Sequence, residues 1–204
     1  MALTIDTPAV LRAAGGATSA KAAARASQSG IWVGMFAITM SFAAFTSALY
    51  IRQASTDWTH IATPRILFLN TFFLILSGAL LEMSRRTLRP DAQRQTAERG
   101  KNRRFLAASL LLGILFVIGQ YSAWRQLRAE GLYLATTPNS SFFYLFTGAH
   151  ALHVLGGLAA LLYLYVHLTV GREVRQNLLN GIVTYWHFMA VLWLYLLLVI
   201  FTRL

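Results

Sequence analysis

The chain has 204 residues, of which 56% are hydrophobic, and only 12% are charged against about 25% in ordinary soluble domains. It contains no cysteine, which excludes disulfides and thiolate metal ligands. The formal net charge is +11, but the basic residues lie between the apolar runs, as they do in membrane proteins. We therefore expect an integral membrane protein and no nucleic-acid partner.

Residues 1–29 are rich in Ala, Ser and Gly and lack the apolar core of a secretory signal peptide. We interpret them as a flexible cytoplasmic tail, and residues 30–204 as one transmembrane domain. A helix of about 20 apolar residues crosses a bilayer. The expected spans are 30–51, 65–84, 105–125, 141–168 and 182–202. The predicted fold class is all-α, a polytopic membrane protein with a bundle of five transmembrane helices.

The second expected span ends in Glu82, which is followed by Arg85 and Arg86. We expect this carboxylate to pair with the two arginines at the membrane surface. The five spans contain no other acidic residue. Pumps and ion carriers usually place Asp or Glu deep in the membrane, so this pattern argues against a self-contained transporter.

The basic residues are distributed unequally between the two sides of the predicted bundle. The tail and the loops that follow the second and fourth spans carry 13 Lys and Arg, and the other side carries 5. Positive residues are retained in the cytoplasm. The N-terminus is therefore predicted to lie in the cytoplasm and the C-terminus outside.

The span 141–168 carries the densest polar motif of any apolar segment. Thr147, His150 and His153 are followed by Gly156 and Gly157. At 3.6 residues per turn, His150, His153 and Gly157 share one face. A polar group facing lipid is costly, so this face should point at other helices. The glycine pair should allow close helix approach.

Two interpretations of the histidines remain open at this point. Thr147, Gln120 and backbone carbonyls are available to hydrogen-bond neutral imidazoles. Alternatively, His153 and His187 lie at similar depths by helical rise, and a haem bridged between their helices would make the chain a small membrane b-type cytochrome.

Three spans resemble subunit III of the haem–copper terminal oxidases, the cytochrome c oxidase subunit III family. The motif SSFFYLFTGAHALHVLGG at 140–157 and YWHF at 185–188, followed by Trp193, carry the likeness. Gln120 and Trp124 match a further Gln and Trp of the family. The likeness covers about residues 30–204. With five spans, the chain is similar to the short form of the family, which lacks the first two of seven helices.

The resemblance implies a non-catalytic subunit of a respiratory oxidase in the bacterial plasma membrane. Haems and copper would reside in partner subunits, and this chain would stabilise the catalytic subunit and its proton-uptake side and hold phospholipid. It would bind no cofactor or metal and contain no catalytic residue. Subunit I would be the main contact, with subunit II and a small subunit IV as further partners. The subunit III of a quinol oxidase and an accessory subunit of a nitric-oxide reductase are alternatives.

The resemblance also implies a set of structural residues in contact with lipid or other subunits. They are Gln120, Trp124, Thr147, His150, His153, Gly157, Trp186, His187 and Trp193.

The chain departs from the family pattern at three carboxylates. The first span lacks the usual membrane Glu, and Ala123 and Ala190 stand where relatives often carry acidic residues. If those carboxylates assist proton uptake in relatives, this chain does so differently or not at all.

Overall fold

The computed structural model describes residues 7–55, 58, 63–87, 92–171 and 176–204, which form five α-helices. These are α1 (Thr7–Arg52), α2 (Ile66–Thr87), α3 (Ala92–Ala129), α4 (Pro138–Thr169) and α5 (Gln176–Arg203). Each contains a segment long and apolar enough to cross a membrane. These segments are Gln28–Arg52, Ile66–Arg86, Gly100–Ala129, Pro138–Thr169 and Gln176–Arg203. The predicted all-α bundle of five spans is confirmed.

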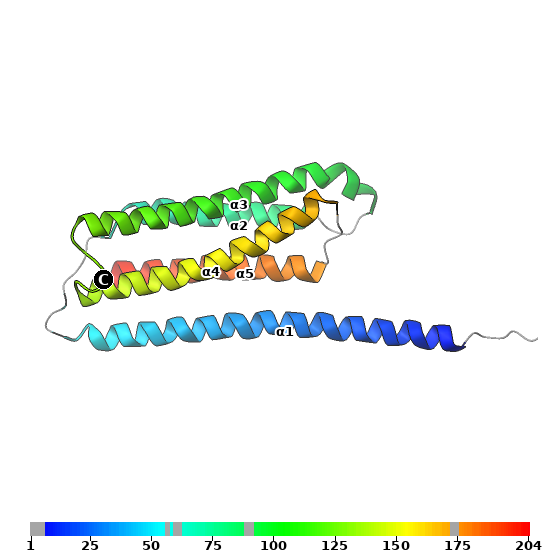
Figure 1. The fold of residues 1–204 in the computed structure, drawn as a ribbon, viewed down its shortest axis with the longest axis horizontal. Coiled ribbons are helices and arrows are strands. Elements are labelled where there is room, and N and C mark those ends of the chain that lie inside the picture. Colours follow the sequence, from blue (N-terminus) through cyan, green and yellow to red (C-terminus); the bar gives the residue numbers. More distant parts are fainter. Residues whose placement is uncertain (1–6, 56–57, 59–62, 88–91, 172–175) are drawn as a thin grey trace, which may run out of the picture.

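The helices lie lengthwise beside one another, and α1 runs along one edge of the bundle (Figure 1). The closest packing is between α2 and α3. α4 packs on α3 and α5, and α5 also packs on α2. Among the described helices, α1 touches only α4 and α5. The core therefore lies between α2, α3, α4 and α5.

Residues 7–29, which were predicted to form most of a flexible tail, belong to the first helix, and their flexibility stays a prediction. This stretch is helical and continuous with the first span, so α1 begins at Thr7. Alanine has the highest helix propensity, and the apolar span supplies the helical turns on which such a stretch propagates. Pro8 is compatible with a first helical turn. The cytoplasmic position of this segment stays a prediction.

A seven-residue repeat explains the close packing of α2 on α3. In α2 it places leucines in one row and small polar residues in the next, at Leu67, Leu74 and Leu81 and at Asn70, Ser77 and Ser84. In α3 the matching row is Asn102, Ser109, Phe116 and Ala123, whereas a second row, Leu106, Gly113, Gln120 and Leu127, includes a glycine where a Cβ would meet Leu158 of α4 and Trp186 of α5. All of these residues are buried. A period near 3.5 keeps one seam of each helix facing the other.

Hydroxyl groups set the register of this seam. Ser77 Oγ donates to the carbonyl of Ser109 at 2.8 Å, and Ser109 Oγ donates to the carbonyl of Ser77 at 2.9 Å. Small residues let backbones approach, and hydroxyls hydrogen-bond across membrane helices. The pair therefore fixes which turn of α2 meets which turn of α3.

The connection between α3 and α4 is held by a capping box. Thr137 caps α4 and its side chain accepts from the backbone N–H of Ser140, while Pro138 occupies the first turn. Tyr144 Oη donates to the carbonyl of Leu132 at 3.0 Å. These contacts set where α4 starts, and so set the depth of its polar face.

Candidate functional site

The polar face of α4 points into the bundle, as predicted. Thr147 and His150 are both fully buried. Thr147 Oγ1 accepts from Trp124 Nε1 of α3 at 2.9 Å and donates to the carbonyl of Phe143 at 2.7 Å. The structure thus brings together Thr147 and Trp124, two of the residues singled out by the sequence.

Two buried tryptophans connect α5 to α2. Trp193 Nε1 donates to Thr71 Oγ1 at 2.9 Å, and Trp186 Nε1 donates to Ser77 Oγ at 3.2 Å. Both indoles are fully buried. Each therefore combines a large packing surface with one hydrogen bond between helices, as expected for buried Trp.

The imidazole of His150 lies between two aromatic rings. Its centroid is 5.8 Å from Phe116 and 5.1 Å from Trp193. Neither ring nitrogen has a hydrogen-bond partner among the described residues. The prediction that Thr147 or Gln120 would bond a buried imidazole here is wrong for His150, because the Thr147 hydroxyl is already engaged by Trp124 and Phe143.

His153 follows the prediction of a backbone partner. Its Nδ1 lies 2.7 Å from the carbonyl oxygen of Ala149, one turn earlier. Its ring centroid is 6.0 Å from that of Phe42 in α1. The backbone carbonyl of His153 also accepts from Tyr185 Oη at 3.0 Å. His153 is therefore a contact between α4, α1 and α5.

His187 faces a different helix. A Cβ placed on Gly78 of α2 would lie 3.2 Å from its Nδ1, and its Nε2 is 3.9 Å from Glu82 Oε2. The ring of His153 on α4 lies against Phe42 of α1, whereas that of His187 on α5 lies against Gly78 of α2, and α1 and α2 do not touch one another. The geometry does not bring His153 and His187 together around a shared ligand.

Glu82 pairs with arginines, as predicted. Its carboxylate accepts from Arg85 Nε and Nη2, both at 2.8 Å, and from Arg86 Nε at 2.9 Å. The spacings of three and four residues place these side chains on one helix face. Such an ion cluster anchors the end of α2 at the membrane surface.

The two glycines of the α4 motif differ. A Cβ on Gly157 would lie 3.0 Å from the ring of Trp186 and 3.2 Å from that of Tyr185. A Cβ on Gly156 would meet no described atom within 4 Å. Close helix approach is therefore confirmed for Gly157, whereas Gly156 lies on the exposed side of α4 and no described helix of this chain approaches it.

Several residues of the core were not recognised from the sequence as contacts between helices. They are Thr71, Ser77, Ser109 and Gly119. Ser77 and Ser109 belong to the seven-residue repeat of α2 and α3, whereas Thr71 and Gly119 stand beside it and had no signal in the sequence. Gly119 provides the tightest contact, since a Cβ there would lie 1.9 Å from Asn70 Oδ1.

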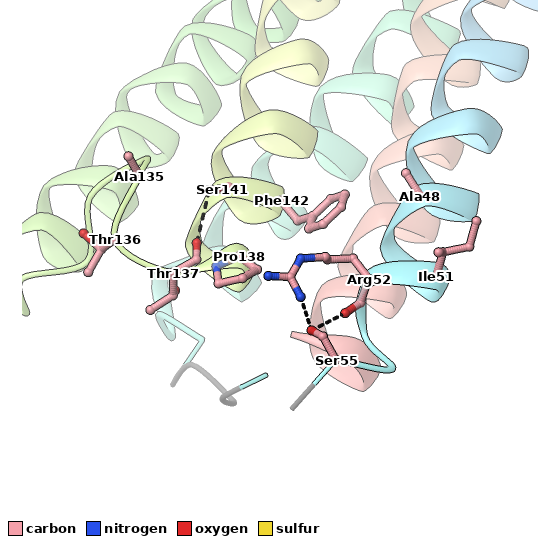
Figure 2. A pocket seen from close by; sticks show the side chains of 10 residues that line it. All are labelled: Ala48, Ile51, Arg52, Ser55, Ala135, Thr136, Thr137, Pro138, Ser141 and Phe142. Carbon is pink, nitrogen blue, oxygen red and sulfur yellow. Dashed lines mark hydrogen bonds between the residues drawn. The ribbon is translucent and has the colours of Figure 1, made fainter. Parts of the chain in front are cut away.

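A groove lies where the end of α1 meets the start of α4 (Figure 2). Ile51, Phe142 and Pro138 provide apolar walls, and Arg52 extends across it toward Pro138. Arg52 Nη1 donates to Ser55 Oγ, whose own hydroxyl donates to the Arg52 carbonyl at 2.7 Å. The groove therefore combines a cation with an apolar surface at the end of a membrane span.

Metal-ligand residues are dispersed. Among the residues that the structure describes, no three His, Asp or Glu side chains gather as a candidate metal site. The polar core is built from hydroxyl, amide, indole and imidazole groups.

These features define a multi-pass membrane helical bundle whose core is joined by buried indoles and hydroxyls. The sequence matches the family model of cytochrome c oxidase subunit III over residues 32–203. The chain belongs to the cytochrome c oxidase subunit III family, as the motifs in the sequence indicated.

Individual relatives agree with this assignment. The probable cytochrome c oxidase subunit 3 of Mycobacterium tuberculosis is 37% identical over 110 residues, which is 52% of this chain and 54% of the relative. The cytochrome c oxidase subunit 3 of Synechocystis is 26% identical over 164 residues, 77% of this chain and 66% of the relative. A heme-copper oxidase subunit I+III of Aeropyrum pernix is 33% identical over 91 residues, 43% of this chain and 11% of the relative. The chain spans about half the length of the first curated relatives that it matches.

Proposed function

We propose that this chain is the non-catalytic subunit III of a respiratory haem–copper terminal oxidase in a bacterial plasma membrane. The observation that carries the proposal is the family match over residues 32–203, which includes nearly all of the five spans. A bundle whose core is filled by its own aromatic side chains suits a subunit that supports another chain.

The environments of the histidines do not favour a haem held between helices of this chain. His150 is enclosed by Phe116 and Trp193, and His153 Nδ1 is engaged by a backbone carbonyl. His187 faces α2 and not His153. This arrangement argues against the small b-type cytochrome, which needs two converging imidazoles.

The exposed surface of α1 supports subunit I as the main partner. Only 17% of the most apolar window of α1 is buried within this chain. Trp32, Val33 and Phe36 are each at least 60% exposed. The Aeropyrum relative is named as a fusion of subunits I and III, so in that protein the two are one chain. Subunit II and a small subunit IV are proposed as further contacts.

The groove between α1 and α4 supports phospholipid binding. Arg52 lies at the end of the first span, where we expect the lipid headgroups. A guanidinium group suits a phosphate, and the apolar walls suit the first part of an acyl chain. Arg52→Gln should reduce the anionic phospholipid that co-purifies with the complex, whereas Arg65→Gln, outside the groove, should not.

The decisive experiment compares the oxidase with and without this chain in the same lipid. We expect the complex without the chain to retain its initial rate of oxygen reduction and to inactivate faster during repeated turnover. Adding the purified chain back should restore the half-life. An immediate loss of nearly all oxygen reduction, with haems and copper still in place, would refute a non-catalytic role. The identity of the co-purifying catalytic subunit separates an oxidase from a nitric-oxide reductase, and its electron donor separates a cytochrome c oxidase from a quinol oxidase.

The proposed orientation has its own test. Since the chain has no cysteine, single cysteines report their side directly. A cysteine at position 96 should resist an impermeant thiol reagent in intact cells, and one at position 134 should react. The reverse labelling pattern would invert the topology.

A further inference from the structure

Three buried polar side chains on adjoining helices have no hydrogen-bond partner among the described residues. They are Asn70 of α2, Gln120 of α3 and His150 of α4, each at most 1% exposed. Both polar atoms of each side chain are inaccessible and unpaired. Lipid offers no hydrogen bonds, so each such group costs several kcal/mol in a membrane.

The three side chains lie at one level of the bundle. The carboxamide of Asn70 rests against Gly119, the neighbour of Gln120 in α3. Phe116, one turn before Gln120, touches the ring of His150 at 5.8 Å between centroids. Asn70 and His150 therefore both lie against the stretch of α3 between Phe116 and Gln120.

Two contacts of α3 with α4 bracket Gln120. α3 and α4 are consecutive helices joined by a short loop and run antiparallel (Figure 1). Phe116 of α3 contacts His150, and Trp124 of α3 bonds Thr147. Gln120 lies one turn from each, on the same face of α3, so it falls between these two contacts.

The other polar groups nearby already have partners. Trp193, whose ring lies 5.1 Å from that of His150, donates to Thr71, and Thr147 accepts from Trp124. The amides of Asn70 and Gln120 and the imidazole of His150 are therefore the groups in this part of the described core that have no partner. We call Asn70, Gln120 and His150 the polar triad.

We propose that the polar triad binds one or two ordered water molecules that bridge α2, α3 and α4. A buried water typically makes about three hydrogen bonds to otherwise unpaired polar groups. The amides offer both donors and acceptors, and a neutral imidazole offers one of each. The triad has no carboxylate, so its chemistry suits a neutral ligand and not a cation. This inference holds whether or not the chain acts in an oxidase.

The test uses the full chain in lipid bilayers, labelled with ¹⁵N, and measures magnetisation transfer from water to side-chain N–H groups by solid-state NMR. We expect transfer from water to the amides of Asn70 and Gln120 and to the ring of His150. His153, whose Nδ1 is held by the Ala149 carbonyl, is the matched imidazole that should show none at Nδ1. Direct bonding within the triad without water transfer would overturn the proposal.

Variants make the assignment specific. Gln120→Met keeps the side-chain length and removes both polar atoms, and should at least halve the water transfer to His150. Ser122→Ala, which removes a hydroxyl bonded to Ile118 within α3, should leave it unchanged. Unchanged transfer in a folded Gln120→Met variant would refute a shared water site. If that variant does not fold, density for the wild-type complex by cryo-electron microscopy decides, because a bridging water must lie about 2.7–3.2 Å from at least two members of the triad.

Discussion

The helix α1 and the pair formed by α2 and α3 are similarly apolar but are held in different ways. Mean hydropathy is 1.6 in the span of α1 and 1.9 in those of α2 and α3. Yet 17% of the apolar window is buried in α1, against 33% in each of the other two. Apolar residues place a helix in the membrane, whereas small and polar residues commit it to a neighbour, because lipid and leucine are equally apolar.

The contacts of α1 follow from one narrow stripe. Met35, Phe42 and Leu49, spaced by seven residues, are its buried apolar side chains, and Thr46 beside them accepts from Tyr195 Oη of α5 at 2.8 Å. The opposite face, with Phe36 63% exposed, has no contact within the described chain that buries it. α1 is therefore the least buried of the five spans that the structure describes.

The largest effect is expected from filling the α2–α3 seam. In Gly119→Val, the new side chain overlaps the buried carboxamide of Asn70, whose Oδ1 lies 1.9 Å from a Cβ at this position. Overpacking of a core costs about 1–3 kcal/mol and occasionally more. Thermal unfolding of the full chain in mild detergent should show the largest loss of stability for this variant. Gly34→Val in α1, where a Cβ meets no described atom within 4 Å, is the matched control. Equal stability of the two variants would remove the distinction between these regions.

A smaller effect is expected within α1 itself. Phe42→Ala leaves a cavity of roughly 100 Å³, which costs about 2 kcal/mol at the usual cavity term. Phe36→Ala, on the exposed face, should leave the stability of the isolated chain unchanged. In the assembled complex the difference between the two variants should become smaller. Phe36→Ala should then weaken retention of this chain during purification. A destabilised isolated chain in Phe36→Ala would show that this face is already packed.

The adjacent glycines of α4 sharpen the comparison further. Gly→Ala within a helix contributes up to about 1 kcal/mol of stability where space permits. Gly156 has that space, and Gly157 is confined by the fully buried Trp186 ring. Gly157→Ala should therefore be about 1 kcal/mol less stable than Gly156→Ala by unfolding in the same detergent. The opposite order would place the close approach of α4 on the other face.

The smallest effect concerns the hydroxyl pair of the α2–α3 seam. Hydrogen bonds between membrane helices average about 0.6 kcal/mol in double-mutant cycles. Ser109→Ala should destabilise slightly, Ser77→Ala should destabilise more because it also removes the acceptor of Trp186 Nε1, and the double variant should lose less than the sum of the two. Ser41→Ala in α1, whose hydroxyl bonds only the carbonyl of Ala37 one turn earlier, is the control paired with Ser109→Ala. Strict additivity of Ser77→Ala and Ser109→Ala would mean that the two hydroxyls do not interact.

Features that depend on one helix were predictable from the sequence. The five spans follow from the length of apolar runs, because a bilayer requires each span to satisfy its own backbone. The pairing of Glu82 with Arg85 and Arg86 and the bond from His153 to the Ala149 carbonyl follow from spacings of three and four residues. The family likewise followed from local motifs. The helical backbone of residues 7–29 was missed because low apolarity was given more weight than alanine propensity.

Features that depend on which helices meet, and at which turn, required the tertiary structure. Gly156 and Gly157 are equivalent by composition, yet one contacts Trp186 and the other contacts no described side chain. From the sequence, Thr147 could have bonded His150. In the structure, α3 places Trp124 where its indole N–H donates to the Thr147 hydroxyl. The sequence determined that these helices lie in the membrane and carry polar groups on one face. Only the register of α3 against α2 and α4 decided which polar groups are paired, because hydrogen bonds act over about 3 Å and one helical turn is 5.4 Å.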